Sequence, residues 1–241
     1  MFVILFILLL ALPSRATDED FKAAIALQNK ADYKQAQTAY IRLLEKDNNN
    51  ALVLNNLSFC QQKLQKYQLA EKNYLKALEC SSSDAQIYNN FASLKLIQNK
   101  TQEAENLYLE AIKKDPDYPF SYNNLASFYQ KQGKFFRAIS FYKQAIDKAP
   151  LAEFYYNLGL LYFDMKKYDD MIETFKKALE MQPNYAEVYY SLALTHYYNL
   201  LELNPNKREK EFAKAFNKLT ILKPELAQKF KTIYNTKNKK I

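Results

Sequence analysis

The sequence predicts an all-α fold of about six helix-turn-helix hairpins stacked in line and closed by a C-terminal capping helix. In residues 121–150, apolar residues recur at i, i+3, i+4 and i+7 in two successive stretches, which is the spacing of one helix face. Gly133 separates the stretches, and Pro150 ends the second because proline cannot continue a helix. The same unit recurs along the chain. Only two glycines are present and no alternating strand pattern is visible, so strands are not expected.

The period is clearest where a large apolar residue precedes a small one in the first helix of each hairpin. These pairs recur every 33 or 34 residues: Ala23-Ala24, Leu57-Ser58, Phe91-Ala92, Leu125-Ala126, Leu158-Gly159 and Leu192-Ala193. The second helices keep this register through Ala36, Ala70, Ala104, Ala138 and Met171, followed four residues later by Tyr40, Tyr74, Tyr108, Tyr142 and Phe175. The small residues predict a close crossing of the two helices. Because neither helix can bury its apolar face alone, each copy is expected to pack on the next.

Turn-forming residues place the copies near residues 17–50, 51–84, 85–118, 119–151, 152–185 and 186–224. Asp84 is expected to cap a helix, and Pro119 to occupy a first helical position, where proline is well tolerated. Copy six carries extra residues near Leu203–Lys210, which predict a longer loop or an extended first helix. Residues 225–241 are predicted to form the capping helix and a basic tail, because a terminal repeat needs a cover for its last apolar face.

At these positions the chain resembles the tetratricopeptide repeat family, which has a 34-residue period. The resemblance covers roughly residues 19–224. It implies a right-handed α-solenoid whose first helices line a concave face. The matches are loosest early in the chain: the first aromatic position of the family holds Asp20 and Leu54, and the next holds Gln61 and Lys95.

Residues 1–16 lie outside the array and are predicted to be a cleaved export signal. Phe2–Leu12 is an unbroken apolar run, shorter than the roughly 20 residues that span a bilayer. Ser14-Arg15-Ala16 is a small-x-small pattern that suits cleavage after Ala16, although no Lys or Arg precedes the run. The expected location is the periplasm or the extracellular or lumenal side of a membrane. The alternatives are a membrane tether through an uncleaved N-terminus and a cytosolic scaffold.

The charge of the chain does not predict nucleic-acid binding. The formal net charge is +8, and loss of residues 1–16 removes one arginine, which leaves 33 − 26 = +7. This charge is spread over the chain and no nucleic-acid-binding motif accompanies it. The one dense block is the tail, with Lys229, Lys231, Lys237, Lys239 and Lys240. Weak attraction of this tail to an acidic membrane surface is the expectation.

The two cysteines, Cys60 and Cys80, both fall in copy two. Their positions in an antiparallel hairpin are about two helical turns apart, too far for a disulfide bond. We therefore expect two buried thiols, with a disulfide bond as the alternative in an oxidising compartment.

No catalytic residue, metal site or cofactor is predicted. The single histidine, His196, occupies an aromatic position of copy six and is expected to be packed there. The sequence contains no metal-ligand cluster, nucleophile motif or glycine-rich loop. These observations favour a non-enzymatic protein.

The candidate binding residues are asparagines at one position of four successive first helices. This asparagine row consists of Asn56, Asn90, Asn124 and Asn157, and a second asparagine precedes the first three, at Asn55, Asn89 and Asn123. In the resembling family this position lies toward the concave face, where an amide can both donate to and accept from a peptide backbone. The alternative is a structural row that bonds neighbouring helices. Further groove-facing candidates are Ser93, Ser127, Phe120 and Tyr156.

The functional hypothesis is an adaptor that binds an extended segment of a protein or peptide partner in the concave groove, with amides on the partner backbone and aromatics on its side chains. The alternative is a structural assembly subunit that forms a homo-oligomer, or docks on a membrane complex, through its ends or convex face.

Overall fold

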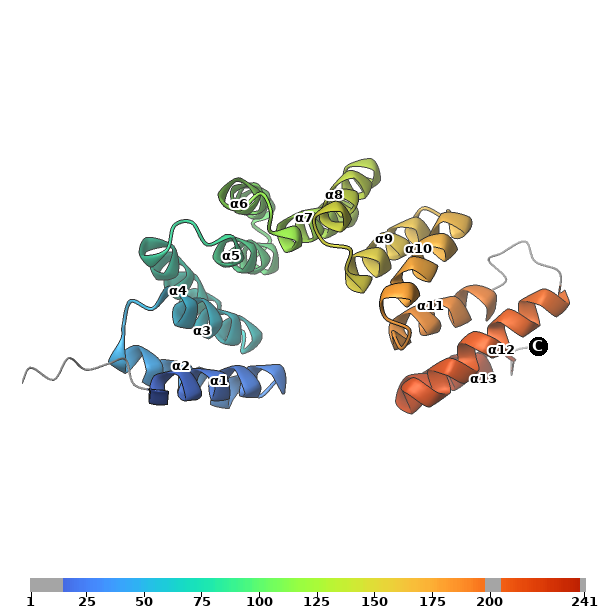
Figure 1. The fold of residues 1–241 in the computed structure, drawn as a ribbon, viewed down its shortest axis with the longest axis horizontal. Helices are drawn as coiled ribbons and strands as arrows, with labels where there is room; N and C mark the ends of the chain where they lie inside the picture. Colours follow the sequence, from blue (N-terminus) through green and yellow to red (C-terminus); the bar gives the residue numbers. More distant parts are fainter. Residues whose placement is uncertain (1–14, 198–204, 239–241) are drawn as a thin grey trace, which may run out of the picture. The chain divides into compact units, whose positions relative to one another are not determined.

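The structure is a computed structural model that describes residues 15–197 and 205–238. The described residues form helices and turns and contain no strand, so the predicted all-α fold is confirmed. The helices follow one another in antiparallel pairs (Figure 1). The chain divides into two compact units, unit 1 (Met1–Pro116) and unit 2 (Asp117–Ile241).

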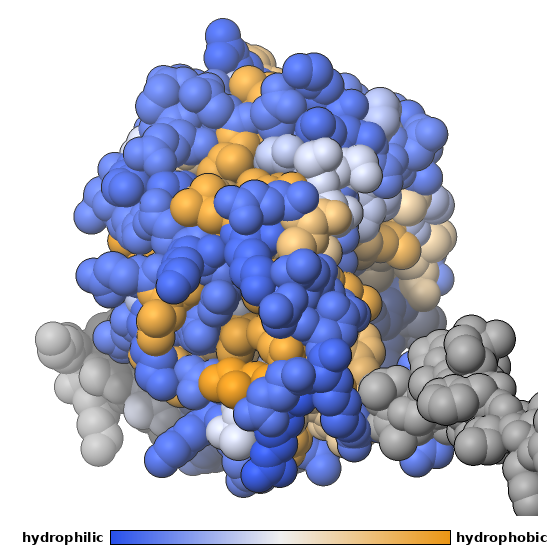
Figure 2. Space-filling model, turned by 90° about the vertical axis from the view of Figure 1, so that its left-hand side faces the viewer, coloured by the Kyte–Doolittle hydropathy of each residue, from blue (hydrophilic) through white to orange (hydrophobic). Residues whose placement is uncertain are grey.

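Unit 1 holds three hairpins, formed by α1 (Arg15–Asn29) with α2 (Tyr33–Lys46), α3 (Ala51–Lys63) with α4 (Tyr67–Cys80), and α5 (Ala85–Ile97) with α6 (Thr101–Lys114). Unit 2 holds α7 (Pro119–Lys131) with α8 (Phe135–Lys148), α9 (Ala152–Asp164) with α10 (Tyr168–Met181), α11 (Ala186–Tyr197) with α12 (Pro205–Leu222), and a last helix, α13 (Pro224–Asn238). Figure 2 shows one side of the molecule as mainly hydrophilic, with a broken band of hydrophobic residues between hydrophilic neighbours.

Capping side chains and one proline set the starts of several helices. The side chains of Asp32, Asn50 and Asp84 accept hydrogen bonds from backbone N–H groups in the first turns of α2, α3 and α5. Pro119 lies in the first turn of α7. The expectations for Asp84 and Pro119 are therefore confirmed.

Each turn inside the first five hairpins contains a residue with positive φ. Gly133 has φ of 70°, and a Cβ atom there would meet nothing within 4 Å. The other four are Ala31, Gln65, Asn99 and Lys166, with φ between 57° and 60°. The left-handed conformation costs roughly 1–2 kcal/mol for a residue other than glycine. The turns of these four hairpins therefore keep the left-handed backbone conformation although their residues disfavour it.

The core of each hairpin is the close crossing that the small residues predict. The small residues of the first helices and the matching residues of the second helices are buried, and Ala24, Ser58, Ala92, Ala126, Ala36, Ala70, Ala104, Ala138 and Met171 are fully so. The aromatic residues that follow them, from Tyr40 to Phe175, are buried as well. Close packing at the crossing brings aromatic rings from the second helix into the space between hairpins.

Buried tyrosine hydroxyl groups of the second helices bond to glutamines of the first helices. The hydroxyl group of Tyr40 donates to Gln28 Oε1 at 3.0 Å, that of Tyr74 to Gln62 Oε1 at 3.3 Å, and that of Tyr142 to Gln130 Oε1 at 2.9 Å. The partner lies 12 residues earlier in each case. The bonds satisfy hydroxyl groups that burial would otherwise leave without water.

The end of unit 2 differs from the sequence interpretation in one respect. Residues 205–210 belong to α12, so this part of the extra segment is neither a loop nor part of the first helix but extends the second helix. Residues 198–204 lie outside the described residues. Ala227 and Phe230 of α13 pack against α11 and α12, in clusters with Ala186, Ala193 and Leu219. The predicted cap is therefore present.

The two cysteines are not bonded to each other. Cys60 is buried, and its thiol lies 3.6 Å from Gln28 Oε1, whereas Cys80 is exposed. The expectation of two buried thiols is wrong for Cys80. None of the helices in the described part of the chain is long and apolar enough to cross a membrane.

Candidate protein-binding surface

The asparagine row forms hydrogen bonds between neighbouring first helices within each unit. In unit 1, Asn90 Nδ2 on α5 donates to Asn55 Oδ1 on α3 at 3.0 Å. In unit 2, Asn157 Nδ2 on α9 donates to Asn123 Oδ1 on α7 at 3.0 Å. Each bond joins the first asparagine of one doubled pair to the row member of the next hairpin. The asparagine row therefore joins neighbouring first helices to each other within each unit.

The two members of each doubled pair differ in burial. Asn55, Asn89 and Asn123 are at most 5% exposed, and Asn89 Nδ2 donates to Ala85 O at 2.9 Å. Asn90, Asn124 and Asn157 are half-buried, whereas Asn56 is buried. The preceding asparagine is therefore the interior residue, and three of the four row members reach the surface.

Between copies five and six, other residue types form the polar link between neighbouring first helices. Tyr156 of α9 occupies the interior position, and its hydroxyl group lies 3.5 Å from the Oγ of Ser191, which holds the row position on α11. Tyr156 also stacks on Phe175, with ring centroids 5.6 Å apart. Phe120 of α7 contacts Phe154 of α9 edge to face at 5.3 Å. Phe120 and Tyr156 are both half-buried. Phe120 links two neighbouring first helices, and Tyr156 links both the helices of its own hairpin and the next first helix.

The two predicted serines face the second helix of their own hairpin. Ser93 hydrogen-bonds the Tyr108 side chain, and Ser127 hydrogen-bonds that of Tyr142. Burial raises the pKa of Tyr108 to about 12, and the bond from Ser93 opposes part of this shift. Both serines are half-buried.

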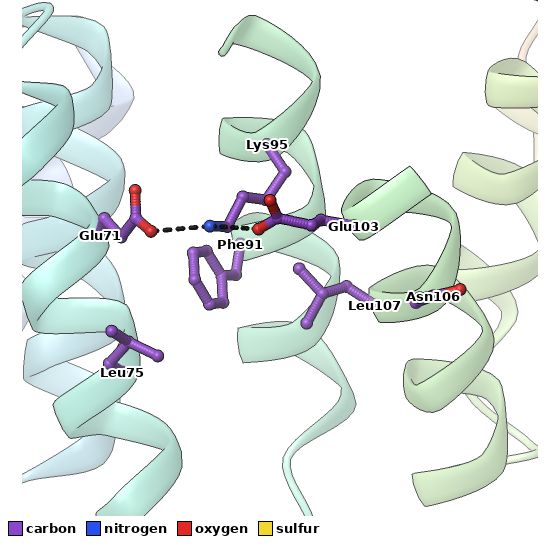
Figure 3. A pocket seen from close by; sticks show the side chains of 7 residues that line it. All are labelled: Glu71, Leu75, Phe91, Lys95, Glu103, Asn106 and Leu107. Carbon is purple, nitrogen blue, oxygen red and sulfur yellow. Dashed lines mark hydrogen bonds and ion pairs between the residues drawn. The ribbon is translucent and has the colours of Figure 1, made fainter. Parts of the chain in front are cut away.

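Unit 1 also contains a hollow between α4 and α6, with α5 behind it, that the sequence did not predict. Its volume is about 300 Å³, and it is lined by Glu71, Leu75, Phe91, Lys95, Glu103, Asn106 and Leu107 (Figure 3). The Nζ atom of Lys95 lies 2.7 Å from Glu71 Oε1 and 2.7 Å from Glu103 Oε2. One lysine of α5 thus bridges two glutamates of the flanking helices.

Lys95 is unusual because its side chain is 6% exposed. Burial by itself lowers the pKa of Lys95, but the bonds to Glu103 and Glu71 outweigh it, and the net pKa is raised. The bond from Lys95 likewise lowers the pKa of Glu71, with a second contribution from Gln98. Lys95 and Glu71 are therefore both charged near neutral pH. The only sequence signal was that Lys95 stands where later copies have Tyr129 and Tyr162.

Family models of the tetratricopeptide repeat match residues 49–117, 107–140 and 152–185, which together make up more than half of the chain. The chain is a tetratricopeptide repeat (TPR) protein. TPR repeats mediate protein–protein contacts, so the chain is a protein-interaction adaptor in general terms. Such repeats are typically non-catalytic scaffolds.

Solved TPR structures share the fold. The chain is similar to TTC0263, a thermophilic TPR protein of Thermus thermophilus, at 19% identity and a TM-score of 0.67, over 78% of this chain and 100% of that one. It is similar to PilF of Pseudomonas aeruginosa at 19% identity and a TM-score of 0.65, over 90% and 97%. It is similar to MamA at 25% identity and a TM-score of 0.52, over 68% and 96%. No protein with a curated description matches the sequence at a significant level.

The single histidine of this TPR chain is packed in its interior. His196 is 6% exposed on α11, and burial lowers its pKa, with a smaller opposite effect from Glu211. This placement agrees with the expectation of a packed histidine. In the part of the chain that the structure describes, no three His, Cys, Asp or Glu side chains are grouped so that they could hold a metal ion.

Proposed function

We propose that this TPR protein is an adaptor whose first-helix surface binds an extended segment of a partner protein. The observation that carries the proposal is the bonded amide of each unit, Asn90 on Asn55 and Asn157 on Asn123. Each bond uses the amide nitrogen of a half-buried asparagine. The orientation of that amide is thereby fixed before any partner arrives.

A fixed amide is suited to peptide backbone. The Oδ1 atoms of Asn90 and Asn157 retain lone pairs that can accept from a partner N–H, and Nδ2 carries a second hydrogen that can donate to a partner C=O. Because the side chain is already held, little rotamer entropy is lost on binding. The structural and the binding interpretations of the row are therefore compatible, because the bond between helices holds each amide in the orientation in which it would meet a partner.

Aromatic residues of unit 2 supply the apolar part of the proposed surface. Phe120 and Tyr156 are half-buried, and each is held by a ring from a neighbouring helix. Rings held in this way offer contact area to partner side chains at low entropic cost.

We further propose that the protein is exported, with residues 1–16 removed. The support is the apolar run Phe2–Leu12 and the pattern Ser14-Arg15-Ala16. In the structure α1 begins at Arg15, so cleavage after Ala16 would remove the first two residues of this helix. The N-terminal residue of the native protein is the test: Thr17 supports export with cleavage, and Met1 overturns it.

The adaptor proposal is tested by chemical cross-linking in the source cells followed by mass spectrometry of what co-purifies. The test variant is Asn90→Ala with Asn124→Ala, and each substitution is expected to weaken binding by about 1–3 kcal/mol at most. The matched control is Asn184→Ala with Asn217→Ala, two exposed asparagines outside the row. A partner that is lost from the test variant and kept by the control supports the proposal. A partner kept equally by both overturns the first-helix surface as its site.

A further inference from the structure

The net positive charge of this chain belongs to its C-terminal segment. Residues 1–204 carry 23 basic and 23 acidic side chains, so their net charge is zero. Residues 205–241 carry 11 basic and 3 acidic side chains, which gives 11 − 3 = +8, the net charge of the whole chain. Counted by segment, the charge is therefore not spread along the chain, and the segment that carries it includes α12 as well as the tail.

The helix α12 presents part of this charge along one face. Lys210, Lys214 and Lys218 are spaced by four residues, so they lie one above another on the helix, and they are called the lysine stripe. Lys210 and Lys214 are exposed, and Lys218 is half-buried. Ala215 and Leu219 of the same helix are buried in clusters with residues of α11 and α13. The core side of α12 is thus occupied, and the stripe lies on another side.

The lysine stripe forms no ion pair with the described side chains. The ion pair that these side chains form at this end of the chain uses Lys223, which follows α12 and binds Glu187 of α11. The pKa of Lys223 is raised by that bond, and the pKa of Glu187 is lowered by it. The charge of Lys223 is therefore matched inside the protein, whereas that of the stripe faces solvent.

The three carboxylates of the segment do not neutralise the stripe. Glu209 is not three or four residues from any of its members, so it does not share their face. Glu211 stands three residues before Lys214, but it is half-buried and close enough to His196 of α11 to oppose part of the pKa shift of that histidine. Glu225 lies on α13. The stripe therefore keeps an excess of positive charge.

An exposed aliphatic side chain continues the stripe. Ile221 follows Lys218 by three residues, on the same face of α12, and is 76% exposed. On α13, Lys229 and Lys231 are exposed as well. The Nζ atom of Lys231 lies 5.9 Å from the ring centre of Phe216, which brings this lysine beside α12. The surface thus combines several separate lysines with one large aliphatic group.

The chemistry of this surface fits an anionic membrane better than a nucleic acid. Ten of the 11 basic residues in 205–241 are lysines. Lysine is a compact, strongly hydrated point charge, whereas arginine is the residue suited to paired contacts with the phosphates of nucleic acids. The stripe and Ile221 include no aromatic ring on which a base could stack. An exposed isoleucine can instead enter the headgroup boundary of a bilayer while the lysines stay at the phosphates.

We infer that the lysine stripe of α12, together with Ile221, is a docking site for a membrane surface rich in anionic phospholipids. The lysines meet the phosphate headgroups, and Ile221 enters the boundary between headgroups and acyl chains. The basic tail, for which the sequence predicts weak attraction to such a surface, adds to this contact rather than making it alone. The site lies on the last two helices, so it goes beyond the first-helix surface of the proposed adaptor function and does not depend on it.

The test measures the affinity of the full chain for vesicles of phosphatidylcholine alone and of phosphatidylcholine and phosphatidylglycerol in equal parts, at low and at high salt. The test variant combines Lys210→Gln, Lys214→Gln and Lys218→Gln. The matched control takes three exposed lysines from other helices of unit 2 and combines Lys131→Gln, Lys143→Gln and Lys176→Gln. Both variants have a net charge of 8 − 3 = +5. The apolar run Phe2–Leu12 is uncharged and the same in every chain, so differences between variants report on the stripe.

Wild type and control are expected to bind the phosphatidylglycerol vesicles alike, and the test variant at least about tenfold more weakly. Ile221→Gln is expected to weaken binding too, but to leave its salt dependence unchanged because no charge is removed. Equal loss in the test variant and the control assigns the effect to net charge and overturns the site. Equal binding of wild type to both kinds of vesicle overturns it as well.

Other polyanions are tested under the same conditions with a single-stranded oligonucleotide and with polyglutamate. If the test variant loses one of these ligands while it binds vesicles as well as the control does, the stripe belongs to a nucleic acid or an acidic protein, and the membrane proposal is overturned. The variant Asn90→Ala with Asn124→Ala is expected to bind vesicles as wild type does. Failure of the first-helix surface as a partner site and failure of the membrane site are therefore separate results.

Discussion

Replacing Gly159 by alanine is expected to destabilise the protein, although alanine is the better helix former. Gly159 lies inside α9 at the position where the other first helices have alanine or serine. A Cβ atom at this position would lie 2.5 Å from Cδ1 and 3.3 Å from Cζ of Phe175, and closer still to Cε1. Real carbon atoms do not approach so closely, so either the ring or the helix has to move.

The ring has little room to move. Phe175 is fully buried, and Tyr156 stacks on it with the ring centroids 5.6 Å apart. Overpacking of this kind costs about 1–3 kcal/mol. The gain in helix propensity from glycine to alanine is about 1 kcal/mol. The steric cost is the larger of the two over most of this range, so we expect a net loss of up to about 2 kcal/mol.

The assay is urea unfolding followed by circular dichroism, combined with amide hydrogen exchange in α9 and α10, because repeat arrays can unfold in parts. The partner variant is Phe175→Leu, which removes the obstructing ring atoms. In that background Gly159→Ala is expected to be neutral or to stabilise by up to about 1 kcal/mol. If Gly159→Ala stabilises the wild-type chain, or costs the same in both backgrounds, the steric argument is refuted.

Three further predictions concern the polar links. Lys95→Met is expected to lower the free energy of unfolding by about 1–3 kcal/mol in urea unfolding, while Lys72→Met, on the exposed surface of α4, serves as the control and changes little. Because the bond from Lys95 lowers the folded-state pKa of Glu71, its contribution is fully present above the ordinary glutamate pKa and is lost as the pH falls through the lowered pKa. The stability difference between wild type and Lys95→Met is therefore expected to shrink in acid, and a difference independent of pH would contradict this. Asn157→Ala leaves a buried acceptor on the neighbouring helix and is expected to cost about 1–2 kcal/mol in thermal unfolding, against less than about 0.5 for the exposed Asn184→Ala.

The fold could be predicted from the sequence because it repeats. A single amphipathic helix is ambiguous, but small residues such as Ala92 and Ala126 that recur in phase identify the crossing of two helices. Each is fully buried in the structure. The structure of the extra segment in copy six could not be predicted in the same way, because nothing in the sequence of residues 205–210 shows whether they lengthen a loop or a helix. Cys80 was placed wrongly since the last turn of a helix can face solvent while the rest is packed.

The ion bridge could not be predicted for a related reason. The sequence shows that Lys95 stands at a position where later copies have an aromatic residue. It does not show which contacts Lys95 makes in place of the packed ring. Its partners Glu71 and Glu103 come from two other helices, 24 residues before it and 8 after it, and neither position is acidic in most copies. A burial that is unfavourable for one lysine becomes acceptable only when three helices are assembled. Period and composition do not contain that information.

The asparagine row shows how copies within one chain separate structure from function. The link between neighbouring first helices is formed by Asn90 with Asn55 and by Asn157 with Asn123, but at the end of the array by Ser191 with Tyr156. A serine and a tyrosine therefore suffice for a polar contact at these positions, so the link alone does not demand asparagine. Asparagine is also a poor helix former, which makes its repeated use in helix interiors costly. What asparagine adds over serine is a planar amide with both a donor and an acceptor left over once the link is made. That surplus capacity is what a peptide backbone requires, and it is the physical reason to seek the partner of this protein on its first helices.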